Sequence, residues 1–183
     1  MKLLDIIRSS GQGAIVANLA AIAGLDQGEA EEALAALLPE LGHAIRRAGG
    51  SRSGAAAVHA AMRDERYRRY LEQPATLQEP QAVEDGERVL DEVLDDDDRG
   101  ELVRRVAAAI GPDEGEVRKL LPQVAALAMA ALGERLRDPA TPAEIHWFGS
   151  DQQDHFAAPL LNALASLFGH EDEQPPKAPP NER

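Results

Sequence analysis

Residues 111–132, GPDEGEVRKLLPQVAALAMAAL, contain the clearest periodic pattern in the chain. Their apolar side chains recur at intervals of three and four residues, which places them on one face of an α-helix. The residues on this face are Val117, Leu120, Leu121, Val124, Leu127 and Leu132. An equivalent face runs through residues 30–45, at Ala30, Leu34, Leu37, Leu38, Leu41 and Ile45. The sequence therefore predicts two long amphipathic helices.

Shorter apolar groups with helical spacing surround these two segments. They are Ile15, Leu19 and Ile22; Val89, Leu90, Val93 and Leu94; and Leu102, Val106 and Ile110. No stretch alternates with a period of two for long enough to predict a β-strand. Only six of the 183 residues are aromatic, and alanine and leucine supply much of the apolar content, a composition that favours helix over sheet. The predicted fold is all-α and multihelical.

The two long segments also resemble each other. GLDQGEAEEALAALLPEL and GPDEGEVRKLLPQV share a glycine turn, an Asp-x-Gly-Glu start and a Leu-Leu-Pro sequence inside the following helix. Pro39 and Pro122 lack an N–H group and should kink their helices. We interpret the pattern as an internal duplication of a unit made of a helix, a turn and a proline-kinked helix.

This interpretation divides the chain into five parts. Residues 1–72 are the first helical repeat, residues 73–85 a connector with two prolines, and residues 86–137 the second helical repeat. Residues 138–168 hold four of the six aromatics, so we expect C-terminal aromatic helices there that pack on the repeats. The polar, proline-rich residues 169–183 are expected to form a disordered tail.

The sequence Asp-x-Gly-Glu occurs three times, and each copy precedes an apolar helical run. Paired acids could be catalytic, but this spacing also suits a helix start. An Asp at the N-cap accepts a hydrogen bond from the third helical residue, and a Glu there reaches back to the cap. We therefore predict helix caps at Asp26/Glu29, Asp98/Glu101 and Asp113/Glu116, and also at Thr141/Glu144 and Ser150/Gln153.

Charge is distributed unevenly along this acidic chain, whose formal net charge is -13. Residues 43–70 contain seven arginines and two acids, whereas residues 71–101 contain twelve acids and two arginines. Neighbouring blocks of opposite sign are expected to attract each other, within the fold or between copies. The excess of acids opposes binding to nucleic acid or to anionic lipid.

Neither a secretory signal nor membrane insertion is expected. The longest apolar run, VAALAMAAL, has nine residues, whereas a helix needs about 20 to cross a bilayer. The expected location is therefore the cytoplasm. The chain has no cysteine, which excludes disulfides, thiolate catalysis and cysteine-based zinc sites. The sequence identifies no cofactor and no small-molecule substrate.

Two metal hypotheses fit the sequence poorly. A calcium loop that starts at Asp95 would need oxygen ligands where Arg99 and Val106 stand, so an EF-hand is excluded. The only other cluster of possible donors, whose spacing matches no known ligand pattern, comprises His146, Asp151, Asp154 and His155. We assign no metal ligand.

A short helix, a turn at Gly24 and a second helix that begins at Asp26 are compatible with a DNA-binding helix-turn-helix. The second helix, however, presents Glu29, Glu31 and Glu32, whose charges would repel phosphate. Only the arginine-rich residues 46–69 could support binding to DNA.

Four stretches carry a resemblance to a known family: LLDIIRSSGQGAIVANLAAIAGLDQGEAEEALAALLPELGHAI, SGAAAVHAAM, EDGERVLDEVL and LVRRVAAAIGPDEGEVRKLLPQVAALAMAAL. Across residues 3–136 the chain resembles the YidB-like family of bacterial proteins, whose function is unknown. The most specific part is a predicted turn, DG…VL, at residues 85–90. The resemblance implies a small all-helical fold in a bacterial cytoplasm and supplies no catalytic residue. The arginine-rich insert RDERYRRYLEQPATLQEP, the tetrad DDDD and the segment HWFG depart from the family pattern.

The expected function is that of a non-enzymatic helical interaction or scaffold protein that self-associates. Alanine-rich faces, opposed charge blocks and a C-terminal aromatic patch favour this hypothesis. The predicted interaction surface comprises Arg63, Arg66, Arg68, Arg69, Trp147, Phe148 and Phe156. The alternatives are a DNA-associated regulator that uses residues 46–69 and a metal-dependent hydrolase that uses the C-terminal histidine and aspartate cluster.

Overall fold

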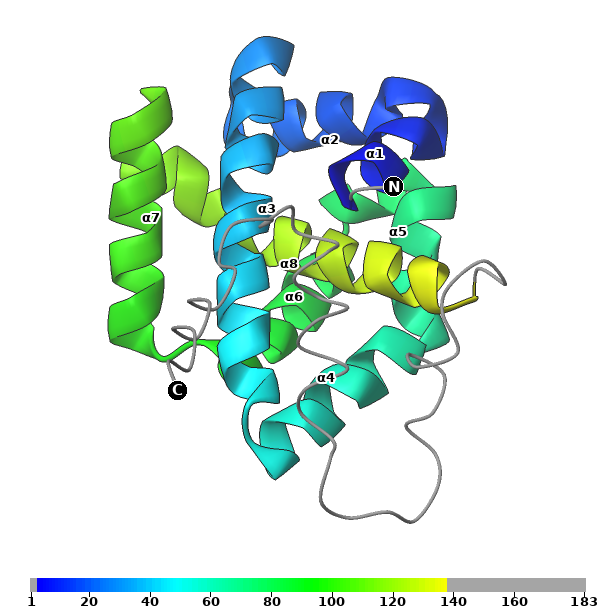
Figure 1. Ribbon diagram of the computed structural model, residues 1–183. Coiled ribbons are helices and arrows are strands. Elements are labelled where there is room, and N and C mark those ends of the chain that lie inside the picture. The colour runs from blue at the N-terminus through cyan, green and yellow to red at the C-terminus, as the bar shows by residue number, and fades with distance from the viewer. Residues whose placement is uncertain (1–2, 138–183) are drawn as a thin grey trace, which may run out of the picture.

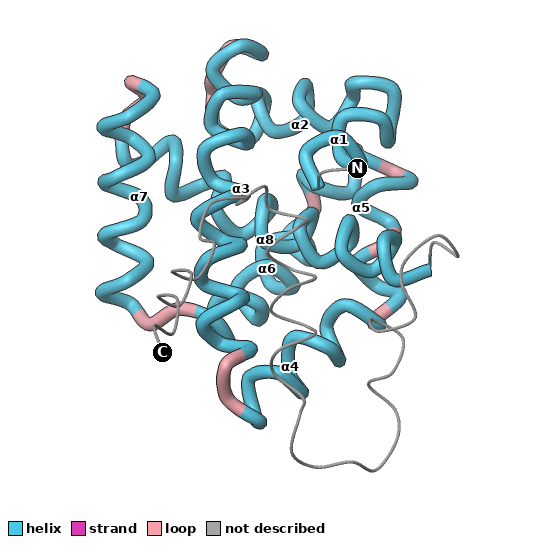
Figure 2. Tube along the Cα trace, in the orientation of Figure 1, coloured by secondary structure: helices cyan, strands magenta, loops and turns pink. Residues whose placement is uncertain are grey.

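The computed structural model describes residues 3–137, and within this range the chain is helical almost throughout, without a strand (Figure 2). Its α-helices are α1 (Leu3–Ser9), α2 (Ala14–Ala23), α3 (Gln27–Gly49), α4 (Arg52–Arg63), α5 (Arg69–Glu72), α6 (Pro80–Val93), α7 (Asp96–Ile110) and α8 (Glu114–Arg137). Three short 3-10 helices complete the path, namely η1 (Ser10–Gly13), η2 (Glu65–Tyr67) and η3 (Pro74–Gln78). The all-α, multihelical prediction is confirmed.

Helix α8 forms the centre of the fold. It contacts each of the other seven α-helices of the described chain, and Figure 1 shows it crossing the middle of the molecule behind α3. All residues from Leu120 to Gly133 are buried, so α8 has no exposed face along this run. Its many alanines leave room for neighbouring helices on every side.

Both predicted apolar faces lie in the core. Every residue of the face in α3 and every residue of the face in α8 is at most 3% exposed. Both helices continue through their internal proline, at Pro39 and at Pro122. The buried apolar side chains of α1 to α8 form one continuous core.

Two of the three predicted Asp/Glu caps are confirmed. At α3, Glu29 N donates to Asp26 Oδ1 and Asp26 N donates to Glu29 Oε2, both at 2.9 Å. Asp113 and Glu116 make the same reciprocal pair of hydrogen bonds at the start of α8, also at 2.9 Å.

The predicted cap at Asp98/Glu101 is wrong. Helix α7 starts one turn earlier, because Asp95 is the N-cap and accepts a 2.8 Å hydrogen bond from Asp98 N. This start leaves three aspartates in the first turn, where they face the positive end of the helix dipole. It also leaves the Asp98 carboxylate able to bind Arg47 of α3, at 2.9 Å. The other two predicted caps, Thr141/Glu144 and Ser150/Gln153, lie outside the described residues.

The prediction of a turn at residues 85–90 is also wrong, since these residues lie in the middle of α6. At Gly86 the backbone of α6 lies directly against the backbone of α8. A Cβ atom on Gly86 would collide with the carbonyl oxygen of Pro122, because it would lie far inside the distance at which non-bonded carbon and oxygen atoms touch. The glycine therefore serves close packing of two helix backbones rather than a turn.

The proposed repeats show similar local geometry at their helix junctions. Gly24 ends α2 and Gly111 ends α7, each in the left-handed conformation, with φ of 82° and 100°. Each is followed two residues later by the aspartate cap of a long helix. Duplication remains a prediction. Residues 73–85, the predicted connector, form η3 and the first part of α6, while residues 138–168 and 169–183 lie outside the described residues.

Candidate functional site

Residues 64–79 fold onto the core through four buried side chains. Tyr67, Tyr70, Leu71 and Leu77 are buried, and the intervening arginines point toward the surface. Asp64 starts this segment, because its carboxylate accepts a 3.0 Å hydrogen bond from Arg66 N. The short turns η2, α5 and η3 therefore place several arginines next to α6.

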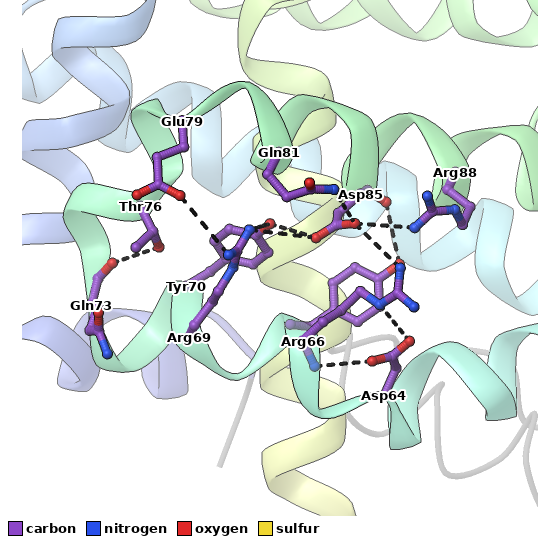
Figure 3. Close-up of polar contacts among 11 residues, drawn as sticks. Asp64, Arg66, Arg69, Tyr70, Gln73, Thr76, Glu79, Gln81, Asp85 and Arg88 are labelled. Carbon is purple, nitrogen blue, oxygen red and sulfur yellow. Dashed lines mark hydrogen bonds and ion pairs between the residues drawn. The ribbon is translucent and has the colours of Figure 1, made fainter.

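A buried carboxylate on α6 binds this segment. The Asp85 side chain is 1% exposed and accepts hydrogen bonds from the Tyr70 hydroxyl at 2.7 Å, from Arg88 Nη1 at 3.1 Å and from Gln81 Nε2 at 3.2 Å (Figure 3). The main-chain carbonyl of Asp85 accepts a further hydrogen bond from the Tyr67 hydroxyl at 3.3 Å. Buried polar groups are tolerated when they are fully paired, and Asp85 meets this condition.

Three arginines surround the same carboxylate. Besides Arg88, Arg66 and Arg69 lie 3.6 and 3.8 Å from its oxygens. Arg69 also donates a 2.8 Å hydrogen bond to the Tyr70 hydroxyl, and its guanidinium lies over the Tyr70 ring, 4.8 Å from the ring centre. We call this group, with the two tyrosines, the Asp85 cluster.

The cluster changes the acidity of its members. Burial alone raises the pKa of the Asp85 carboxyl, but hydrogen bonds from Tyr70 and Gln81 and the charges of Arg66 and Arg69 outweigh this effect, so the pKa lies below its usual 3.8. Burial raises the pKa of the Tyr70 hydroxyl to about 12, and its hydrogen bond to Asp85 adds to the rise. Asp85 is therefore ionised and Tyr70 is a neutral donor at neutral pH.

An open groove between α4 and α6 adjoins the Asp85 cluster. Its volume is about 420 Å³. The apolar lining comes from Ala57, Val58, Ala60 and Ala61 of α4, Val89 and Val93 of α6, Tyr67 of η2 and Met129 of α8, and the polar lining is Asp64, Arg66, Arg88 and Glu92. We call this feature the α4–α6 groove. It has the composition of a site for an apolar protein segment with polar ends.

The structure separates the predicted interaction residues. Arg66 lines the α4–α6 groove, Arg69 belongs to the Asp85 cluster, and Arg68 forms a 2.7 Å ion pair with Glu72 in its own segment. Arg63 lies on another side of α4, where it lines a second hollow with His59 and Met62. The three remaining residues, Trp147, Phe148 and Phe156, lie outside the described residues.

The opposed charge blocks meet within the fold. Arg66 and Arg69 of the basic block bind Asp85 of the acidic block, and Arg47 binds Asp98 at 2.9 Å. The arginine-rich segment is therefore largely neutralised by its own chain. This arrangement leaves little unpaired positive charge for a nucleic-acid backbone.

The alternative sites receive no new support from residues 3–137. A short turn joins α2 to α3, but Glu29 and Glu32 are exposed at the start of α3. Within the described part of the chain no three histidine or acidic side chains are placed to hold a metal ion. The cluster His146, Asp151, Asp154 and His155 lies outside it. Across the same range, no helix combines the length and apolarity needed to cross a membrane.

The sequence analysis missed Asp85, although a signal for it exists. The buried face of α6 comprises Ala82, Asp85, Gly86, Val89, Leu90 and Val93. These positions follow the spacing of an amphipathic helix, so an aspartate at the second position predicts a buried acid that needs partners.

Comparison with protein families agrees with the resemblance found in the sequence. Residues 5–135 match the model of a family described as bacterial protein of unknown function (DUF937). Searches among curated proteins and among solved structures return no match. The matched range contains α2 to α7 whole and almost all of α8, and it includes both the Asp85 cluster and the α4–α6 groove. The chain belongs to the DUF937 family.

Proposed function

We propose that this protein is a non-enzymatic interaction protein that self-associates through the α4–α6 groove. The observation that carries the proposal is the groove itself, an open hollow with a mainly apolar lining beside a helix rich in alanine. Ala56 and Ala60 are exposed on α4. Their small side chains allow the backbone of another helix to approach closely, and grooves of this kind hold amphipathic helices in many complexes.

A second copy of the chain is the partner that fits the charges of the groove. Its edge carries Arg66 and Arg88 together with Asp64 and Glu92. In a two-fold symmetric interface the same surface faces itself, so it must be complementary to itself. Two cations and two anions on one edge meet this requirement, because each arginine can face an acid of the other copy.

The test is the mass of the protein in solution, measured by light scattering behind a sizing column over a range of concentrations. The proposal expects a mass above that of one chain at high concentration, which falls on dilution. Ala60→Glu should abolish this rise, because it places a charge in the apolar wall of the groove.

Ala108→Glu is the matched control. Ala108 is exposed on α7 and, like Ala60, lies in the last turn of its helix. The change Ala108→Glu should therefore lower helix propensity by the same amount as Ala60→Glu, without affecting the groove. A constant single-chain mass, or equal effects of the two substitutions, would overturn the proposal.

A further inference from the structure

Two backbone contacts fix the positions of α4 and α6 on the central helix α8. A Cβ atom on Gly133 of α8 would lie 2.5 Å from the carbonyl oxygen of Met62, near the end of α4. A Cβ atom on Gly86 of α6 would collide in the same way with the carbonyl of Pro122. In both places one helix backbone packs directly on another, which requires glycine. Helix α8 therefore holds α6 at Pro122 and α4 at Gly133.

The residues that make these two contacts share one face of α8 with Met129. Pro122 and Gly133 are separated by three helical turns, or about 16 Å along the helix axis. Met129 lies between them at the same helical phase. It is 1% exposed, and among the residues that line the α4–α6 groove it is the one that α8 contributes. Met129 therefore forms the floor of the groove, between the two points where α8 holds its walls.

The floor can adapt its shape, whereas the wall formed by α4 cannot. A methionine side chain is unbranched and fills irregular gaps, but the α4 residues above it include Ala57, Ala60 and Ala61. A second copy offers few large apolar side chains to fill the groove, since Val83 is the only large hydrophobic residue exposed within residues 3–137. Contact between two such surfaces leaves space that Met129 can fill by extending toward the partner.

We propose that Met129 is the residue of α8 that contacts the second copy through the floor of the groove, and that Gly133 is its positioning residue. By letting α4 pack on α8 without an intervening side chain, Gly133 keeps the alanine wall close to the floor. The contact made by Met129 rests on the proposed function. The positioning of α4 by Gly133 does not, because it concerns the single chain.

Methyl NMR of the methionines in the full chain tests the contact. The protein has three methionines, Met1, Met62 and Met129, so each signal can be assigned by substitution. We expect the Met129 signal to shift as the protein concentration rises and the mass increases. The signal of Met62, which lines the hollow on the other side of α4, should stay in place. A Met129 signal that does not move while the mass rises would overturn the contact.

Gly133→Ala tests the positioning role, first in dilute solution. The new methyl group should push α4 away from α8 and shift the Met129 signal of the single chain, because the Tyr67 ring lines the same groove and its magnetic effect depends on distance. The concentration at which the mass rises should increase roughly fivefold or more. Gly100→Ala, where a Cβ atom meets nothing within 4 Å, should change neither quantity. A lower midpoint of thermal unfolding with an unchanged Met129 signal would mean that Gly133 has only a structural role.

Met129→Ala and Leu127→Ala form a second, matched pair that leaves Gly133 intact. Leu127 is fully buried on the same helix and does not line the groove. Both changes leave a cavity in the core and should lower stability similarly, but only Met129→Ala should raise the association concentration, again roughly fivefold or more. Equal effects would overturn the contact role.

The two parts of the inference can fail separately. A constant single-chain mass in the wild type would sink self-association and the contact made by Met129 together. The Met129 signal of dilute Gly133→Ala would then still decide whether Gly133 positions α4. Concentration-dependent assembly with no response to either Gly133→Ala or Met129→Ala would leave self-association standing and overturn both parts of the inference.

Discussion

Asp85 is the only carboxylate among residues 3–137 that is fully buried. Its oxygens receive donors from Tyr70 and Gln81 and lie close to three arginines. The arginines themselves keep contact with water, since the Arg66 and Arg88 side chains are 46% and 54% exposed. The carboxylate is therefore the shared anchor that fixes residues 64–72 to α6.

Replacement of Asp85 by asparagine keeps the shape of the side chain and removes its charge. We expect the free energy of unfolding to fall by about 2 kcal/mol, because hydrogen bonds to a buried charge are lost while the arginines can turn to solvent. Urea unfolding followed by circular dichroism measures this change. Asp91→Asn is the control, since Asp91 is 72% exposed and surface ion pairs contribute about 0–1 kcal/mol. Equal losses in both variants would contradict the anchor role.

The pH dependence of stability follows from the lowered pKa of Asp85. A carboxyl whose pKa is lower in the folded state than in the unfolded state contributes its full stabilisation at pH values above the pKa of the unfolded state. That contribution is lost as the pH falls through the folded pKa. The difference in unfolding free energy between the wild type and Asp85→Asn should therefore be constant near pH 7 and shrink below 3.8. Unfolding curves at several pH values measure it, and a difference that persists in acid would exclude this linkage.

The helices themselves were predictable where periodicity is strong. The apolar faces of α3 and α8 could be predicted because burial on one face demands a repeat of three and four residues. The start of α7 could not be predicted, since four consecutive aspartates all qualify as an N-cap. In the fold Asp95 caps the helix, and Asp98 instead pairs with Arg47, which is distant in sequence. The α4–α6 groove could not be predicted from the sequence either, because it forms only where two helices pack together in the fold.

Close packing between α6 and α8 depends on Gly86, whose backbone lies against that of Pro122. Gly86→Ala should destabilise the protein by several kcal/mol, although alanine favours helix by about 1 kcal/mol. The new methyl group would collide with the Pro122 carbonyl, which is backbone and cannot move aside alone. The measurement is the midpoint of thermal unfolding.

Gly100→Ala is the matched control for this substitution. Gly100 lies inside α7, and a Cβ atom there meets nothing within 4 Å. It should raise stability by up to about 1 kcal/mol through helix propensity alone. If both glycine variants were stabilised, the close approach of α6 to α8 would be wrong.

At the scale of the whole molecule, the two proposed repeats are not independent bodies, because both pack around α8 in one core. We expect hydrogen exchange to show the buried amides of α3 and of α8 opening together, with one free energy equal to that of global unfolding. Exchange measured at increasing denaturant concentration tests this expectation. A lower opening free energy for residues 3–49 alone would indicate separate folding units.

The central position of α8 also matters while the protein is being synthesised. Translation delivers α1 to α7 before α8, so their apolar faces leave the ribosome without the helix that covers them. At about 5–20 residues per second, the 88 residues between the end of α3 at residue 49 and the end of α8 at residue 137 take several seconds. During that interval the nascent chain presents exposed leucine and isoleucine faces to chaperones. Ribosomes that stall before residue 114 would therefore release an aggregation-prone fragment rather than a smaller folded protein.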